Sequence, residues 1–207
     1  MGGRPLLALL VLTTSLPAQE TDLLTKIWNG VQQAQTKHVS GCGRITETRT
    51  SMILAKPMIF RGKFCAEGMA RFSLEYTEPE AVKIRFNQDY LNVTTGDGKN
   101  TEVIDVGGDV RRTQSYFGKA NSIENLKKNF AISASQDVHT YSLRLVPLSA
   151  NFRRKLNYVV VRLDKEQFLL RSLEVDGKSG VNSVFTIELT SLDTKIPAST
   201  FEVYRPR

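Results

Sequence analysis

Residues 72–86, FSLEYTEPEAVKIRF, contain the pattern that decides the fold. Apolar and polar residues alternate on both sides of the segment TEPE at 77–80. Strict alternation is typical of β-strands that bury one face, and Pro79 favours a turn between them. The stretch therefore predicts an antiparallel hairpin whose apolar side chains share one face of a sheet. These side chains belong to Phe72, Leu74, Tyr76, Val82, Ile84 and Phe86.

Alternation with a period of two continues through most of the chain. Short turn segments, such as Glu67-Gly68 and Asp176-Gly177, separate the alternating stretches. Strands joined by such short links pair with their neighbours in an antiparallel meander. We expect about eleven strands, at residues 39–50, 58–67, 70–77, 81–87, 90–95, 101–106, 109–115, 141–146, 157–164, 168–176 and 183–192.

Two segments, 21–37 and 121–132, have helical periodicity instead. In the second, Asn121 and Glu124 have the spacing of a capping box. A long antiparallel sheet must cover its apolar face, and these two amphipathic helices are the available covers. They either close the core completely or leave an apolar pocket of lipid size. The helix residues expected to face the sheet are Trp28, Val31, Ile123, Leu126 and Phe130.

Residues 1–18 have the three parts of a secretory signal peptide. Arg4 precedes an apolar run from Leu6 to Leu12, and small residues lead to Ala18. The run is too short to span a bilayer, which takes about 20 residues. We expect cleavage after Ala18, which leaves residues 19–207 as a single exported domain. The alternative is an uncleaved N-terminal helix.

Export gives the two cysteines a structural meaning, because disulfides persist outside the cytoplasm. Cys42 and Cys65 lie in two neighbouring predicted strands. If these strands form a hairpin centred between Ile53 and Leu54, Cys42 lies directly opposite Cys65. Opposite residues of an antiparallel pair are close enough for a disulfide. The alternative is a pair of buried free thiols.

Composition and motifs argue against several classes of function. The chain has 207 residues, 41% of them hydrophobic, and a net charge of +7 from 28 Lys+Arg and 21 Asp+Glu. Basic residues form small clusters, such as Lys127-Lys128 and Arg153-Arg154-Lys155, without the interleaved aromatic residues of an RNA-binding sheet. The sequence has no G-x-S-x-G, H-E-x-x-H, C-x-x-C or P-loop motif. We therefore expect no enzyme, no metal site, no cofactor and no nucleic-acid partner.

Five stretches carry a family resemblance, and it depends on their order and spacing. They are FRGKFCAEGMARFSLEYTEPE at 60–80, YLNVTTGDGKNTEVIDVGGDV at 90–110, YSLRLVPLS at 141–149, LNYVVVRLDKEQFLLRSLEVDGKSGVNSVFTIEL at 156–189 and IPASTFEVYRP at 196–206. Together with the helix expected at 21–37 and the strand expected at 39–50, which precede them, these stretches span about 180 residues. In this order and spacing they resemble the periplasmic lipoprotein carrier (LolA) family of Gram-negative bacteria.

The resemblance implies an unclosed antiparallel β-barrel with helices as a lid over a hydrophobic cavity. Family members take acylated lipoproteins from an inner-membrane ABC transporter, carry them across the periplasm and pass them to an outer-membrane receptor. The resemblance therefore implies these partners, and we expect a monomer. Two positions depart from the family: Glu67-Gly68-Met69-Ala70 replaces an Arg-Pro pair that ties the lid to the barrel, and Leu74 replaces a Trp.

On this interpretation the apolar face of the 72–86 hairpin lines a cavity for acyl chains, which cost about 0.8 kcal/mol per CH₂ to leave in water. Two alternatives remain: a lipid-binding or lipoprotein-sensing protein on the same scaffold, and an envelope protein whose sheet is simply packed. Weaker cavity candidates come from neighbouring strands, namely Phe60, Phe64, Leu91, Val93, Leu143 and Leu145.

Overall fold

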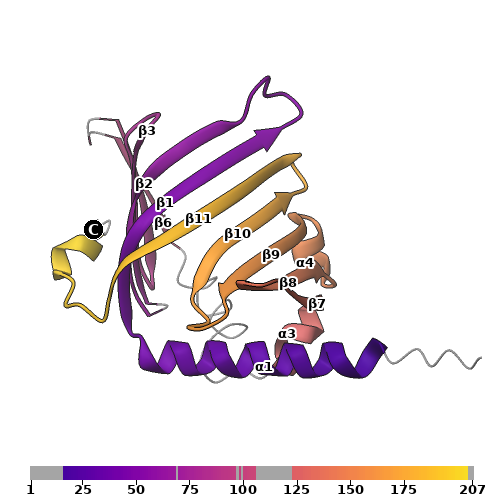
Figure 1. The fold of residues 1–207 in the computed structure, drawn as a ribbon. Coiled ribbons are helices and arrows are strands. Elements are labelled where there is room, and N and C mark those ends of the chain that lie inside the picture. Colours follow the sequence, from indigo (N-terminus) through magenta and orange to yellow (C-terminus); the bar gives the residue numbers. More distant parts are fainter. Residues whose placement is uncertain (1–15, 69, 97, 99, 106–122, 205–207) are drawn as a thin grey trace, which may run out of the picture.

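The computed structural model describes residues 16–68, 70–96, 98, 100–105 and 123–204, which form one curved sheet with helices against it (Figure 1). The helices are α1 (Leu16–Lys37), α3 (Ile123–Asn129), α4 (Ala150–Arg153) and the 3-10 helix η1 (Ala198–Phe201). The strands are β1 (Ser40–Ser51), β2 (Met58–Glu67), β3 (Arg71–Glu78), β4 (Val82–Asn87), β5 (Tyr90–Thr95), β6 (Asn100–Asp105), β7 (Phe130–Gln136), β8 (Thr140–Pro147), β9 (Leu156–Asp164), β10 (Leu170–Gly177) and β11 (Val181–Leu192).

All neighbouring strands are antiparallel, in the order β6-β5-β4-β3-β2-β1-β11-β10-β9-β8-β7. β1 pairs with both β2 and β11, so the first and last strands of the chain form the middle of the sheet. In the described part of the chain, β6 and β7 are edge strands. The sheet therefore stays open, which confirms the predicted unclosed antiparallel barrel.

The hairpin that the alternating stretch predicted consists of β3 and β4. Its register pairs Phe72 with Phe86, Leu74 with Ile84, and Tyr76 with Val82. Because paired residues lie on the same face of a sheet, these six side chains share one face, as the alternation indicated.

The β1–β2 hairpin also has the predicted register. Cys42 pairs with Cys65, and the two form a disulfide between neighbouring strands in the middle of the sheet. The link therefore ties β1 to β2 near the end of the strands where α1 leads into β1.

Two helix boundaries differ from the prediction. α1 begins at Leu16 rather than at residue 21, so residues 16–18 of the expected signal peptide are helical. Residues 1–15 lie outside the described part. α3 ends at Asn129, and Phe130, which we expected on this helix, is the first residue of β7.

β7 itself was not predicted. The spacing of Ile123, Leu126 and Phe130 is helical, and it runs directly into the alternation of Phe130, Ile132 and Ala134. Phe130 fits both the helical spacing and the alternation of a strand. The predicted helix therefore ended beyond Asn129, where α3 ends in the structure. The strand expected at 109–115 lies outside the described residues.

α1 covers the half of the concave face that β7 to β10 form (Figure 1). Leu24 and Ile27 of α1 pack against Tyr141, Leu143 and Leu163. A second group joins Leu126, Phe130 and Leu145 with Trp28 at its margin. α1 also approaches Phe168 closely, because a Cβ on Gly30 would lie only 2.3 Å from the Phe168 ring.

The C-terminal segment crosses the opposite, convex face. η1 packs against β3 and β4, and Phe201 is buried there. The Asn92 side chain accepts a hydrogen bond from the backbone N–H of Tyr204 and donates one to its carbonyl. None of the described helices has both the length and the apolar character needed to cross a lipid bilayer.

Candidate functional site

The concave face continues beyond the half that α1 covers. Strand pairing aligns Leu143, Val161, Leu173 and Phe185 in one row across the sheet. The row continues through Glu47 to Phe60. The face under α1 and the face of the predicted hairpin are therefore the same surface.

An apolar group occupies this second half, and we call it the hairpin-face cluster. Buried Ile45, Leu74 and Tyr76 form its centre. In the described part of the chain, all its members come from strands, and its half-buried members leave apolar surface accessible on the concave side. These half-buried members are Phe60, Phe64, Phe72, Val82, Ile84, Phe185 and Ile187.

A buried carboxylate interrupts this apolar surface. Glu47 is only 2% exposed. Its oxygens accept hydrogen bonds from the Tyr76 hydroxyl at 2.7 Å, from the Ser183 hydroxyl at 2.9 Å and from the Arg49 guanidinium at 2.8 Å. The Arg49 guanidinium also stacks over the Phe60 ring, at 4.6 Å from its centre. Burial of a charge is tolerable because three donors surround it.

The same arrangement changes the acidity of Tyr76. Burial, followed by the hydrogen bond to Glu47, raises the pKa of the Tyr76 hydroxyl well above its ordinary value. The hydroxyl therefore remains protonated at neutral pH and acts as a hydrogen-bond donor. This group is suited to hold β1, β3 and β11 together rather than to exchange protons.

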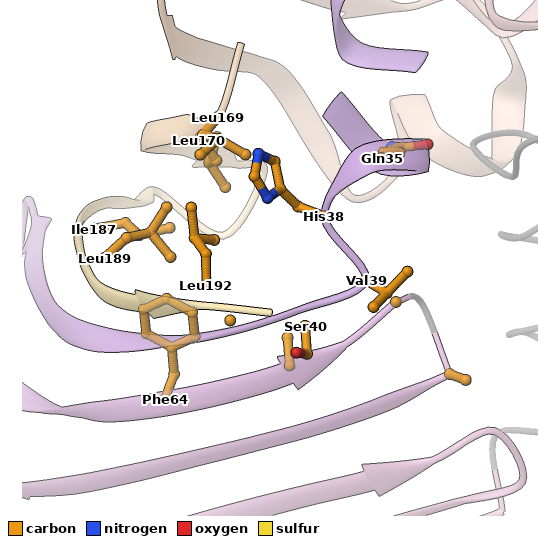
Figure 2. Close-up of a pocket in the computed structure, with 14 residues that line it drawn as sticks. Gln35, His38, Val39, Ser40, Phe64, Leu169, Leu170, Ile187, Leu189 and Leu192 are labelled. Carbon is orange, nitrogen blue, oxygen red and sulfur yellow. The ribbon is translucent and has the colours of Figure 1, made fainter. Parts of the chain in front are cut away.

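A cavity of about 620 Å³ lies where α1 leads into β1 (Figure 2). This volume is within the range of small-molecule sites, about 300–1,000 Å³. In this view Ile187, Leu189 and Leu192 lie close together, and the His38 ring extends toward them from the end of α1. The residues that line the cavity are Gln35, His38, Val39, Ser40, Gly41, Phe64, Ala66, Gly68, Ala70, Leu169, Leu170, Ile187, Leu189 and Leu192.

Small residues create this space. Gly41 of β1, Ala66 of β2, and Gly68 and Ala70 of the β2–β3 turn line the cavity, where larger side chains would fill it. Phe64 and Ile187 belong both to the cavity and to the hairpin-face cluster. The cavity is therefore continuous with the uncovered half of the concave face.

A histidine–aspartate pair holds one wall of the cavity in place, because His38 lines the cavity and pairs with Asp193. His38 Nδ1 lies 2.6 Å from Asp193 Oδ2, and the Val39 N–H donates to Asp193 Oδ1 at 2.9 Å. The Asp193 N–H in turn donates to the Ser40 carbonyl at 2.9 Å. The hydrogen bond from His38 is the main reason that the pKa of Asp193 lies below its ordinary value. These contacts join the end of β11 to the corner between α1 and β1.

The predicted site residues divide into three groups. Leu143 and Leu145 are core residues beneath the helices, together with Trp28, Val31, Ile123, Leu126 and Phe130. Phe60, Phe72, Leu74, Tyr76, Val82 and Ile84 lie in the hairpin-face cluster. Phe86, Leu91 and Val93 are half-buried, and strand pairing places them on the same face.

Of the cavity residues predicted from the sequence, Phe64 alone lines this cavity. The alternation of Ile187 and Leu189 could have indicated the β11 wall. The remaining lining residues include glycines, alanines and His38 at a helix end, and nothing in their sequence pattern marks a cavity. Among the described residues, no cluster of His, Cys, Asp or Glu has the size needed to hold a metal ion.

No protein-family model and no curated protein matches this sequence. Solved structures do match. An uncharacterized conserved protein from Thermus thermophilus aligns over 88% of this chain and 94% of its own, with a TM-score of 0.56 and 8% identity. MucB aligns over 89% of this chain and 63% of its own, with a TM-score of 0.51 and 9% identity.

The LolA superfamily protein NE2245 from Nitrosomonas europaea aligns over 86% of this chain and 97% of its own, with a TM-score of 0.44 and 12% identity. At these identities the likeness concerns the fold alone.

Proposed function

We propose that this protein is a periplasmic carrier for acylated lipoproteins, which binds their acyl chains in the cavity and along the hairpin-face cluster. In this proposal an inner-membrane ABC transporter supplies the lipoprotein, and an outer-membrane receptor accepts it. The observation that carries the proposal is the cavity of about 620 Å³ with its mainly apolar lining. The sequence resemblance to the LolA family supports the same function.

The continuity of the apolar surface suits an extended ligand. A chain that fills the cavity contacts Phe64 and Ile187, and beyond them it meets Leu74 and Ile84 of the hairpin-face cluster. Burying roughly ten CH₂ groups contributes about 8 kcal/mol, which corresponds to a micromolar complex before the costs of association. Binding of this strength is reversible, as a carrier requires.

The polar part of the lining suits the other end of such a ligand. His38, Gln35 and Ser40 line the cavity beside its apolar residues. The Gln35 amide and the second ring nitrogen of His38, Nε2, provide hydrogen-bonding groups for the ester or amide linkages that join acyl chains to a lipoprotein, whereas the Ser40 hydroxyl already donates to the Thr194 carbonyl at 3.0 Å. A ligand with an apolar tail and a polar linkage therefore matches the lining better than a purely apolar molecule.

The test combines native ligands with a cavity-filling variant. Protein purified from the periplasm without detergent would be searched for bound species by mass spectrometry. Binding of a fluorescent diacylated lipopeptide would then be measured for the wild type and for Ala66→Trp, whose new side chain occupies the cavity. We expect at least tenfold weaker binding for Ala66→Trp, because its indole would displace several buried CH₂ groups.

Ala131→Trp is the matched control, because Ala131 is an exposed strand residue of β7 outside the cavity lining. It should bind the lipopeptide like the wild type. If the native protein held only phospholipid or fatty acid and did not bind the lipopeptide, the alternative of a lipid-binding protein on this scaffold would replace the carrier. If the wild type bound none of these molecules, the acyl-binding proposal would be wrong.

A further inference from the structure

The end of the sheet opposite the cavity carries exposed apolar side chains. The cavity lies at the beginning of β1 and the end of β11, whereas the β1–β2 turn at 52–57 lies at the other end of these strands. In this turn Met52 is 96% exposed and Ile53 is 93% exposed, the highest values among the large hydrophobic residues of the described chain. Single exposed apolar residues are ordinary, so these two adjacent ones need a second observation before they point to an interaction site.

Three further segments adjoin this tip. The Met52 methyl group lies 3.9 Å from where a Cβ on Gly180 would be, in the β10–β11 turn. The Lys178 N–H of that turn donates to the Lys155 carbonyl at 2.9 Å. The Leu148 N–H, at the other end of the segment 148–155, donates to the last residue of α3 at 2.7 Å. We call the segments 52–57, 177–180, 148–155 and 127–129 the basic rim; its turns and α4 lie along the right side of Figure 1.

The basic rim is strongly cationic and contains no acidic residue. In the described part of the chain, none of its basic residues takes part in an ion pair with an acidic residue. The nearest acidic turn along the sheet joins β3 and β4; its Glu78 is paired with Arg61, and its Glu80 is exposed. The exposed basic residues of the rim are Lys56, Lys127, Lys128, Arg153, Arg154, Lys155 and Lys178.

We propose that the basic rim docks on the surface of an anionic lipid bilayer, with Met52 and Ile53 inserted among the acyl chains. Exposed apolar tips flanked by unpaired cations match a bilayer, which offers anionic headgroups above an apolar interior. Each basic residue near such a surface strengthens binding by about fivefold. Because the rim and the cavity lie at opposite ends of the sheet, docking does not depend on acyl binding, and each can be tested without the other.

Co-sedimentation with vesicles tests whether the basic residues of the rim and the apolar residues Met52 and Ile53 contribute to membrane binding. The full chain would be mixed with vesicles of phosphatidylglycerol and phosphatidylcholine, or of phosphatidylcholine alone. We expect binding to the anionic vesicles, weakened at least tenfold in Lys56→Glu/Lys178→Glu and severalfold in Met52→Ser/Ile53→Ser. Matched controls are Lys195→Glu and Val138→Ser, because both residues are exposed at the cavity end of the sheet. They should bind like the wild type.

A tryptophan at the tip reports insertion directly. Ile53→Trp would be compared with Val138→Trp, each combined with Trp28→Phe, since Trp28 is the only tryptophan. We expect anionic vesicles to shift the emission of Ile53→Trp to shorter wavelength and brominated lipids to quench it, with neither effect for Val138→Trp. Vesicle binding that the rim substitutions leave unchanged, equal binding to neutral vesicles, or unquenched emission from position 53 would overturn the proposal. Capture of an acidic protein without vesicle binding would also overturn it.

Discussion

At the scale of single residues, Glu47 stands out because, among the described residues, it is the buried one that carries a charged side chain. Its carboxylate lies in a row of apolar side chains, between Phe60 and Phe185, and is nearly inaccessible to water. Removing a hydrogen-bond donor from a buried charge costs more than removing one at the surface. The partners of Glu47 should therefore matter more for stability than similar partners elsewhere.

We predict that Tyr76→Phe lowers the free energy of unfolding by roughly 1–3 kcal/mol, because Glu47 loses the donor at 2.7 Å without gaining water. Urea denaturation followed by circular dichroism measures the change. Tyr158→Phe is the control, since the Tyr158 hydroxyl donates to Glu174 at 2.9 Å from a half-buried position. Its effect should be smaller, and an equal loss in both variants would show that the burial of Glu47 has no special role.

The His38–Asp193 pair predicts a pH dependence. The pKa of Asp193 is lower in the folded chain than its ordinary value of 3.8, mainly because His38 hydrogen-bonds to the carboxylate. A group with a lowered folded pKa stabilises the fold above its unfolded pKa, and this contribution disappears as the pH falls through the folded pKa. The melting temperature of Asp193→Asn should therefore lie below that of the wild type near neutral pH, and the gap should begin to narrow near pH 4 and close once the pH has fallen through the lowered folded pKa.

The pH dependence of the melting temperature of Asp137→Asn provides a comparison. Hydrogen bonds from Thr140 and the His139 N–H lower the pKa of Asp137 to about 2. The stability gap of Asp137→Asn should therefore close only near pH 2. Thermal unfolding of the three proteins at several pH values decides the matter. A gap for Asp193→Asn that does not change with pH would mean that the carboxylate charge does not contribute.

At the scale of elements, the contact between α1 and the sheet depends on a residue without a side chain. Gly30 lies inside α1, where glycine is normally unfavourable, and the Phe168 ring occupies the space beside it. The same ring stacks on Tyr141, with 5.3 Å between ring centres and 19° between planes. The helix is thus held against β8 and the β9–β10 turn by a contact that only glycine permits.

We predict that Gly30→Ala destabilises the fold, although helix propensity alone would stabilise it by about 1 kcal/mol. The new methyl group would lie 2.3 Å from Phe168, so the helix or the ring must move. Thermal unfolding gives the sign of the change. Phe168→Ala removes the clash, so the double variant should be more stable than the sum of the single effects predicts. Strict additivity would show that the two residues do not meet.

The disulfide gives a prediction for the first hairpin. The sequence separation of Cys42 and Cys65 is 23 residues. Closing a loop of this length stabilises a fold by roughly 3 kcal/mol, through restriction of the unfolded chain. Cys42→Ala/Cys65→Ala should lose about this amount in urea denaturation. A reductant should cause the same loss in the wild type and none in the double variant. No loss on reduction would mean that the strand pairing alone determines the stability of the hairpin.

At the scale of the whole molecule, the sequence pattern predicted the register of neighbouring strands but not the position of the cavity. Alternation gave the β3–β4 register, and the centre of the first hairpin gave the pairing of Cys42 with Cys65. The pairing of β1 with β11 joins strands from the two ends of the described chain, so no local pattern specifies it, and it was not predicted. The cavity depends on which small residues meet at a corner, and alternation identifies apolar faces but not the places where they are left unfilled.

The same reasoning explains why Leu143 and Leu145 are core residues rather than cavity residues. Their alternation is indistinguishable from that of Leu74 and Ile84. The difference lies in α1 and α3, which cover β7 and β8 and not the hairpin-face cluster. What covers a strand is a property of the assembled fold, and the sequence specifies it only through many weak contacts.

Helices cover the edge strand β7 but not the edge strand β6, so we predict that the amides of the two strands differ in protection from hydrogen exchange. β6 and β7 each pair with a single neighbour, but most residues of β6 are exposed, whereas Phe130 and Ile132 of β7 pack beneath the helices. Local opening costs more where apolar contacts must break. In hydrogen exchange followed by mass spectrometry, the hydrogen-bonded amides of β6 should exchange at least tenfold faster than those of β7.

Hydrogen exchange in the presence of a bound ligand provides a second comparison. Filling the cavity should slow exchange at the start of β1 and the end of β11, which line it, and leave β6 unchanged. Equal protection of β6 and β7 in the free protein would show that position in the sheet, and not cover by helices, sets local stability. The predicted inequality would instead mean that the open half of the sheet is the part that can adjust to a ligand, because it has the fewest apolar contacts to break.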